Sequence, residues 1–67
     1  MSNESRRYAK DAKTELEKAR DHAREAKEYF KYAGDKEGEK HANNVEKVAD
    51  DASKYVDRRL GGAQKGS

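Results

Sequence analysis

The side chains that could do chemistry in this chain are carboxylates, amines and two imidazoles, His22 and His41. There is no cysteine, so the chain can form neither a disulfide nor a thiolate metal site. The sequence shows no serine–histidine–aspartate arrangement and no phosphate-binding loop. Two histidines are also too few for a metal centre unless acids complete it. We therefore expect no enzyme, no bound metal and no cofactor.

Charged residues make up 45% of the 67 residues, hydrophobic residues 31%, and proline is absent. Such a composition is typical of long helices and coiled coils, and the length allows one small domain. No apolar run approaches the ~20 residues of a membrane span. The N-terminal stretch lacks the apolar segment of a signal peptide. We expect a soluble, cytoplasmic protein.

Small and apolar residues recur in steps of three and four along both halves of the chain. In the first half they are Ala9, Ala12, Leu16, Ala19, Ala23, Ala26, Phe30 and Ala33, and in the second half Ala42, Val45, Ala49, Ala52 and Val56. In a heptad lettered a to g, position a holds Ala9, Leu16, Ala23 and Phe30 in the first half and Ala42, Ala49 and Val56 in the second half. The other residues of the two series occupy position d. The pattern predicts two helices that face each other along an alanine-rich coiled-coil seam.

Start and stop signals place the ends of these helices. Ser2, Asn3 or Ser5 can cap the first helix, and Gly34 with Asp35 suits the turn between the two. Gly61-Gly62 is expected to end the second helix. We predict helices over about 4–33 and 36–60, a turn at 34–35, a single domain over 1–60, and a flexible glycine-rich tail over 61–67.

A connection this short predicts antiparallel helices, so the fold class is an all-α two-helix hairpin. The preferred register pairs Ala26 with Ala42 and places Phe30 over Gly38. A register shifted by one heptad would instead pair Phe30 with Val45. In the preferred register Arg20 faces Glu46 and Lys27 faces Glu39. Because alanine layers bury little surface, we expect self-association, as in a four-helix bundle, or a partner.

Heptad position g carries a second stripe that the seam does not bury. The predicted partner interface on this stripe consists of Tyr8, His22, Tyr29, His41, Val48 and Tyr55. The alternative is that these tyrosines simply lie along the surface with their hydroxyls in water.

A row of cations on the first helix suggests a second kind of surface. The candidate contacts to a polyanion are Arg6, Lys10, Lys13, Arg20, Arg24 and Lys27. A basic stripe of this kind can follow a nucleic-acid backbone. Ordinary solvated charge pairs three and four residues apart explain much of the same pattern.

The expected architecture resembles the Rop-type RNA-binding homodimers in its hairpin shape and alanine seam. The segment VDRRLGG, residues 56–62, is similar to the endings of small actinobacterial antitoxin-like proteins. Our leading hypothesis is a non-enzymatic protein–protein interaction module that acts as a small regulator or inhibitor and self-associates. The alternatives are a nucleic-acid-binding hairpin and a designed or purely structural hairpin that has no partner.

Overall fold

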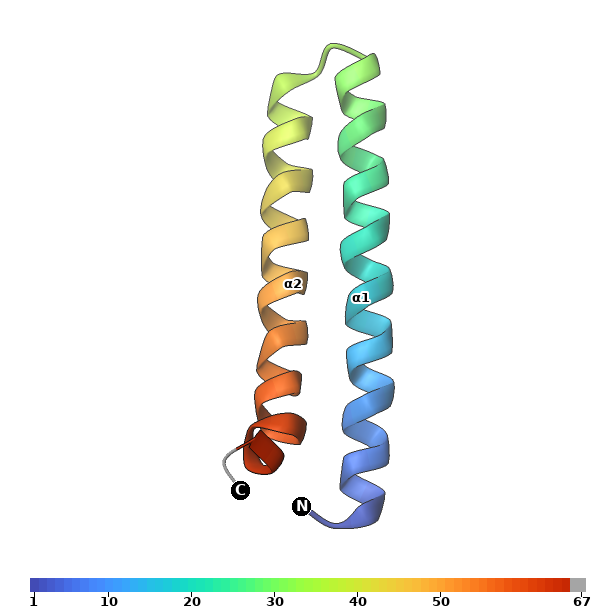
Figure 1. The fold of residues 1–67 in the computed structure, drawn as a ribbon. Helices are drawn as coiled ribbons and strands as arrows, with labels where there is room; N and C mark the ends of the chain where they lie inside the picture. Colours follow the sequence, from blue (N-terminus) through green and yellow to red (C-terminus); the bar gives the residue numbers. More distant parts are fainter. Residues whose placement is uncertain (66–67) are drawn as a thin grey trace.

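Two long helices joined by a tight turn make up the fold of this computed structural model, which describes residues 1–65, with side-chain detail for residues 1–61. Helix α1 spans Asn3–Tyr32 and helix α2 spans Lys36–Lys65, and they pack side by side with opposite directions (Figure 1). The longest dimension is 48 Å, close to the ~45 Å that 30 helical residues span. The prediction of an all-α antiparallel hairpin is confirmed.

The turn and the helix starts follow the predicted signals. Ser2 is the N-cap of α1, and its hydroxyl accepts a hydrogen bond from the Ser5 N–H at 3.1 Å. After α1, Gly34 adopts a φ of 71°, a left-handed conformation that glycine reaches without a steric penalty. Asp35 Oδ1 then accepts a hydrogen bond from the Gly38 N–H at 2.9 Å and so caps α2.

The far end of α2 differs from the prediction, because the helix continues to Lys65 instead of ending at residue 60. Glycine costs a helix about 1 kcal/mol relative to alanine but does not forbid it, and no proline follows Gly61-Gly62 to stop it. Residues 61–65 of the predicted flexible tail therefore belong to α2. Residues 66 and 67 lie outside the described residues.

The contact between the helices uses a different stripe from the predicted one. The buried residues are Ala23, Gly38, Ala42, Ala49, Ser53, Val56 and Leu60. Those of α2 beyond the first turn occupy positions a and e, not a and d. On α1 the half-buried residues are mostly at positions a and e, with Glu17 at b and Ala26 at d as the exceptions. Both helices are thus rotated so that position e takes a larger part in the seam than position d.

Most of position d is correspondingly open, which corrects the predicted seam, while Ala26 and Ala52 at d remain half-buried. Ala12, Ala19 and Ala33 are exposed, and Val45 is 54% exposed. The C-terminal half of α2 supplies a physical reason for the rotation. An a/d seam would bury the guanidinium of Arg59 at d, whereas the observed seam buries Leu60 at e, which is 8% exposed.

Phe30 lies against Gly38 at the closed end of the hairpin, as the preferred register predicted. The Phe30 ring occupies the space that a side chain at position 38 would need. The heptad-shifted register, with Phe30 paired to Val45, is not the one observed.

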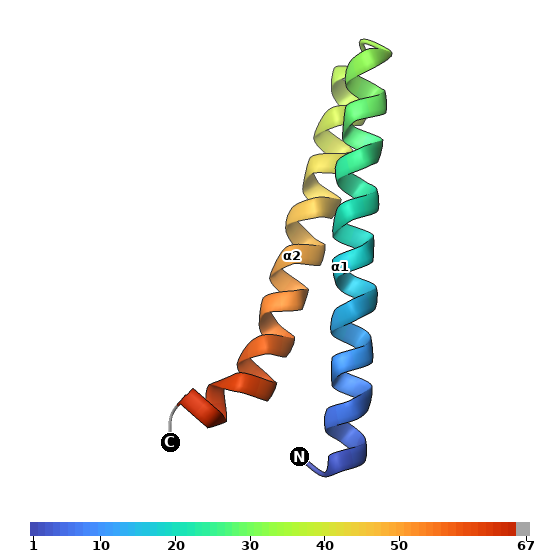
Figure 2. The ribbon, with the colours of Figure 1, turned by 45° about the vertical axis from the view of Figure 1, so that its right-hand side comes forward.

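Figure 2 shows α2 inclining away from α1 toward the open end, so the axes cross at an angle. Within the described chain, neither helix is long and apolar enough to cross a membrane.

Candidate interaction surface

One side of the hairpin carries a ladder of polar contacts between the two helices. We call this side the ionic face, and its cross-helix pairs are Lys13–Asp57, Arg20–Asp50, Arg24–Glu46 and Lys27–Asn43. Arg24 Nε donates to Glu46 Oε2 at 3.0 Å. Lys27 Nζ donates to Asn43 Oδ1 at 3.1 Å, and Arg20 Nη1 lies 3.6 Å from Asp50 Oδ1.

The ladder keeps one register along most of the hairpin. From Lys13 to Lys27 the α1 members advance by seven, four and three residues, and from Asp57 to Asn43 the α2 members go back by the same steps. The predicted partners were Arg20 with Glu46 and Lys27 with Glu39. Arg20 instead binds Asp50 and Lys27 binds Asn43, each four residues further along α2 than predicted. The helices are rotated, so position e of α1 now lies in the seam.

Neighbouring charged groups shift the pKa of three members of the ladder. The hydrogen bond from Lys54, with the nearby Arg20 guanidinium, holds the pKa of Asp50 below its usual 3.8. A hydrogen bond to Asp57 raises the pKa of Lys13 above its usual 10.5. The pKa of Arg20 is raised mainly by its hydrogen bond to Asp21. Each of these three shifts favours the charged form of its own group.

The candidate polyanion contacts mostly belong to this ladder. Lys13, Arg20, Arg24 and Lys27 bind acceptors on α2, and Arg6 Nη2 donates to the Leu60 carbonyl oxygen at 3.3 Å. Lys10, the sixth residue, is exposed on the same side of α1. A polyanion would therefore have to compete with acceptors on α2 for five of these six cations.

The opposite side of the hairpin is apolar. We call it the apolar face and define it by Tyr8, Ala12, Ala19, Tyr29, Val45, Val48, Ala52 and Tyr55, which occupy positions d and g. The tyrosines are 55–69% exposed and Val48 is 67% exposed. His22 and His41 are exposed at position g of the same face. All six predicted interface residues thus lie on one exposed side of the hairpin.

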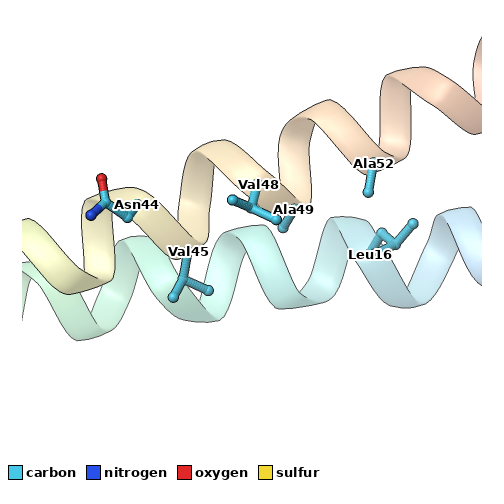
Figure 3. Close-up of a pocket in the computed structure, with 6 residues that line it drawn as sticks. All are labelled: Leu16, Asn44, Val45, Val48, Ala49 and Ala52. Atoms are coloured by element: carbon cyan, nitrogen blue, oxygen red, sulfur yellow. The ribbon is translucent and has the colours of Figure 1, made fainter.

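An open groove of about 340 Å³ runs along this face between the helices. Its lining residues are Leu16, Asn44, Val45, Val48, Ala49 and Ala52. Figure 3 shows Ala52 pointing from α2 toward Leu16 on α1, with Val45 further along toward the turn. Asn44 is the one amide in a lining that is otherwise aliphatic.

The sequence reasoning missed part of this face, because it assigned Val45, Ala19 and Ala52 to the seam. The signal that could have found them lies in the last turns of α2, where Ser53 and Leu60 at position e suit a helix contact better than Arg59 at d. Among the residues that the structure describes, no group of three or more histidine, aspartate and glutamate side chains could hold a metal ion.

No protein-family model matches the chain, and neither a curated protein nor a solved structure matches it. The surface must therefore be interpreted from its own residues.

Proposed function

We propose that this chain is a non-enzymatic interaction module that works by covering a protein surface with its apolar face, as a small regulator or inhibitor does. The observation that carries the proposal is the gathering of exposed aromatic and aliphatic side chains on one face. Tyr29, Val48 and Tyr55 are all more than half exposed there. Contiguous apolar patches on small proteins commonly mark interaction sites.

The small seam supports the same proposal. No large side chain is fully buried among the described residues, and the buried apolar residues are three alanines, one valine and one leucine. A core of this size contributes little against the ordering of two long helices. Covering the apolar face would add the burial that the seam lacks.

The test uses the double variant Tyr29→Ser/Tyr55→Ser in sedimentation equilibrium over a wide concentration range. We expect association to move to concentrations about tenfold higher or more, since buried tyrosines often dominate interface energetics. Circular dichroism should show that the helices remain. The matched control is Tyr32→Ser, which removes an exposed tyrosine from outside the predicted interface. If the unmodified chain associates, an unchanged mass distribution for the double variant would show that this face is not the interface.

The alternative of a nucleic-acid-binding hairpin has weaker support, because five of its six candidate cations already bind groups on α2. Titration with generic RNA and DNA at two salt concentrations separates the two functions. A phosphate-binding face gives an affinity that falls steeply with salt, while an interaction module gives none at low salt.

A further inference from the structure

We propose that the apolar face binds a cationic amphipathic helix of another protein, which lies lengthwise in the groove between α1 and α2. The inference rests on the proposed function and adds the chemical class of the partner. Two observations carry it: the groove has an aliphatic lining that suits a helix, and the outer edges of the face carry more acids than cations.

The lining of the groove suits a helix better than an extended segment. It offers one polar side chain, the Asn44 amide, among aliphatic groups such as those of Leu16 and Val48. An extended chain has backbone N–H and C=O groups that need partners, and leaving them unpaired in an apolar groove costs free energy. A helix pairs these groups within itself and can place its apolar stripe in the groove.

The sizes of the side chains along the groove determine what the partner must supply. On α1, the exposed alanines Ala12 and Ala19 lie one turn on either side of Leu16, while α2 contributes Val45 and Val48. The alanines leave room beside α1 that large side chains of the partner would fill, since packed helices lie only 8–10 Å apart. The partner helix should therefore carry large aliphatic residues, such as leucine, on the side that enters the groove.

Positions c and g form the outer edge of the apolar face on each helix. Asn44 at position c lines the groove, whereas position f lies toward the ionic face, where Lys54 pairs with Asp50 at 3.1 Å. On α1 the exposed charged residues at positions c and g are one cation, Lys18, and the acids Glu4, Asp11, Glu15 and Glu25. The outer edge on α1 is therefore acidic.

Ion pairs within α1 neutralise little of this edge. Lys18 lies 3.4 Å from Glu15 and so compensates that one acid. Within residues 1–61, Glu4, Asp11 and Glu25 form no ion pair with a cation of the chain. These three carboxylates are exposed and available to a cation from outside the chain.

The edge on α2 is mixed. Its exposed acids at position c are Glu37 and Asp51, and its cation is Arg58, which lies near the open end with Arg59 at position d. Glu37 also lies 3.9 Å from Lys40. Over positions c and g of both helices, acids thus outnumber cations, and most of the excess lies on α1.

The acidic excess favours a cationic partner over a second copy of the chain. Two copies placed face to face would double the acids around one interface, and like charges across an interface lower affinity. A helix with lysines or arginines beside its apolar stripe instead places opposite charges against the edge of α1. Self-association through the same face is then the weaker interaction, and a cationic helix competes with it.

The test uses two synthetic helical peptides that share one leucine stripe, one with lysines and the other with glutamates on the remaining positions. Each peptide carries one tryptophan in its leucine stripe, and because the chain itself contains no tryptophan, peptide fluorescence reports binding. We expect the lysine peptide to bind about tenfold more tightly than the glutamate peptide at low salt. The difference should shrink at high salt, where exposed charges are screened.

Val48→Ser locates the binding on the groove. Val48 is 67% exposed and lines the groove, so its replacement removes apolar contact with the peptide without opening the seam. We expect the affinity for the lysine peptide to fall about tenfold. Circular dichroism should show that the helices of the variant remain.

A matched pair of charge reversals tests the acidic edge. Glu25→Lys at position c should weaken the lysine peptide about threefold and strengthen the glutamate peptide. The control is Glu28→Lys, which makes the same change of net charge on the same helix but at position f, toward the ionic face. It should leave both affinities nearly unchanged.

Four results would overturn the inference. Equal binding of the two peptides would show that the edges select no charge, and equal effects of Glu25→Lys and Glu28→Lys would show that binding follows net charge alone. Binding that Val48→Ser leaves unchanged would place the peptide outside the groove. No binding of either peptide up to about 1 mM would remove the cationic helix as the occupant. The proposed function is decided separately, by the sedimentation of the Tyr29→Ser/Tyr55→Ser variant.

Discussion

The ionic face and the apolar face are built by the same two helices, but they relate to the partner helix in different ways. On the ionic face, cations such as Arg24 reach an acceptor on the neighbouring helix, and the contacts keep one register. On the apolar face, side chains such as Val48 and Tyr29 point into solvent. The comparison supports our proposal that the ionic face aligns the two helices of the hairpin, whereas the apolar face binds a partner.

This division has a physical basis. Exposed ion pairs add little to stability, but they penalise wrong registers that would bring like charges together. Apolar contacts are not directional, so they stabilise without selecting one alignment. In this hairpin the directional contacts lie inside the chain, and much of the apolar surface remains for association.

The largest expected effect is a difference in stability between substitutions at two alanines of the predicted seam, Ala23 and Ala19. Ala23 is buried in the seam at 7% exposure, and Ala19 lies exposed on the apolar face. Ala23→Leu should push the helices apart and lower the free energy of unfolding by about 1–3 kcal/mol. Ala19→Leu should leave it nearly unchanged, since leucine is nearly as good a helix former as alanine. Thermal and urea unfolding followed by circular dichroism measure both.

Equal destabilisation by the two substitutions would mean that position d belongs to the seam after all. Because association also stabilises, the comparison is made at one protein concentration for both variants.

A smaller effect is expected from truncating one valine on each face. Val56 is 8% exposed in the seam and Val45 is 54% exposed on the apolar face. Val56→Ala removes two buried carbon groups and should cost about 1.6 kcal/mol of unfolding free energy. Val45→Ala should cost much less in the monomer but weaken association in sedimentation. If Val45→Ala destabilises the hairpin as much as Val56→Ala at dilute concentration, the two faces are not distinct.

The smallest effect concerns the ionic face and depends on pH. Asp50 has a lowered pKa in the fold, so its contribution is present above its unfolded pKa and is lost as pH falls through the folded value, below 3.8. Lys13 has a raised pKa, so its contribution is present below its unfolded value and is lost as pH rises through the folded value, above 10.5. The stabilisation that Asp50 and Lys13 contribute therefore spans the range between these limits.

The thermal midpoint should fall modestly as pH is lowered from about 5 to about 2, and the fall should be smaller in Asp50→Asn. A matched comparison is Asp51→Asn, whose carboxylate lies exposed on the outer side of α2, outside the ladder. An Asp50→Asn profile that matches the unmodified chain at acid pH would show that the Asp50 carboxylate does not stabilise the fold.

The fold could be predicted well because its determinants are local. The glycine at 34 suits a left-handed turn, Asp35 caps the next helix, and a connection this short forces antiparallel neighbours. Phe30 over Gly38 also followed from the register. These signals are single residues whose conformational preferences do not depend on the rest of the chain.

The rotation of the helices could not be read from the same pattern, because alanine is compatible with either a seam or a surface. Ala12 and Ala23 are the same residue type at positions d and a, yet one is exposed and the other buried. The stripe that forms the contact between the helices depends on long side chains that reach across it. Their stems cover part of the seam while their charges bind a partner on the other helix. That balance is set by both helices together. The end of α2 was missed for a simpler reason, since Gly61 weakens a helix without stopping it.

The matched steps of the ladder, in which Lys13 to Lys27 on α1 mirror Asp57 to Asn43 on α2, have one more consequence. An insertion in one helix alone would misalign every rung beyond it. Seven residues added to both arms at the same height would leave the remaining rungs aligned, because each heptad returns the same stripe to the same side. The length of this rod can therefore change in steps of one heptad, with the turn and its cap left as they are.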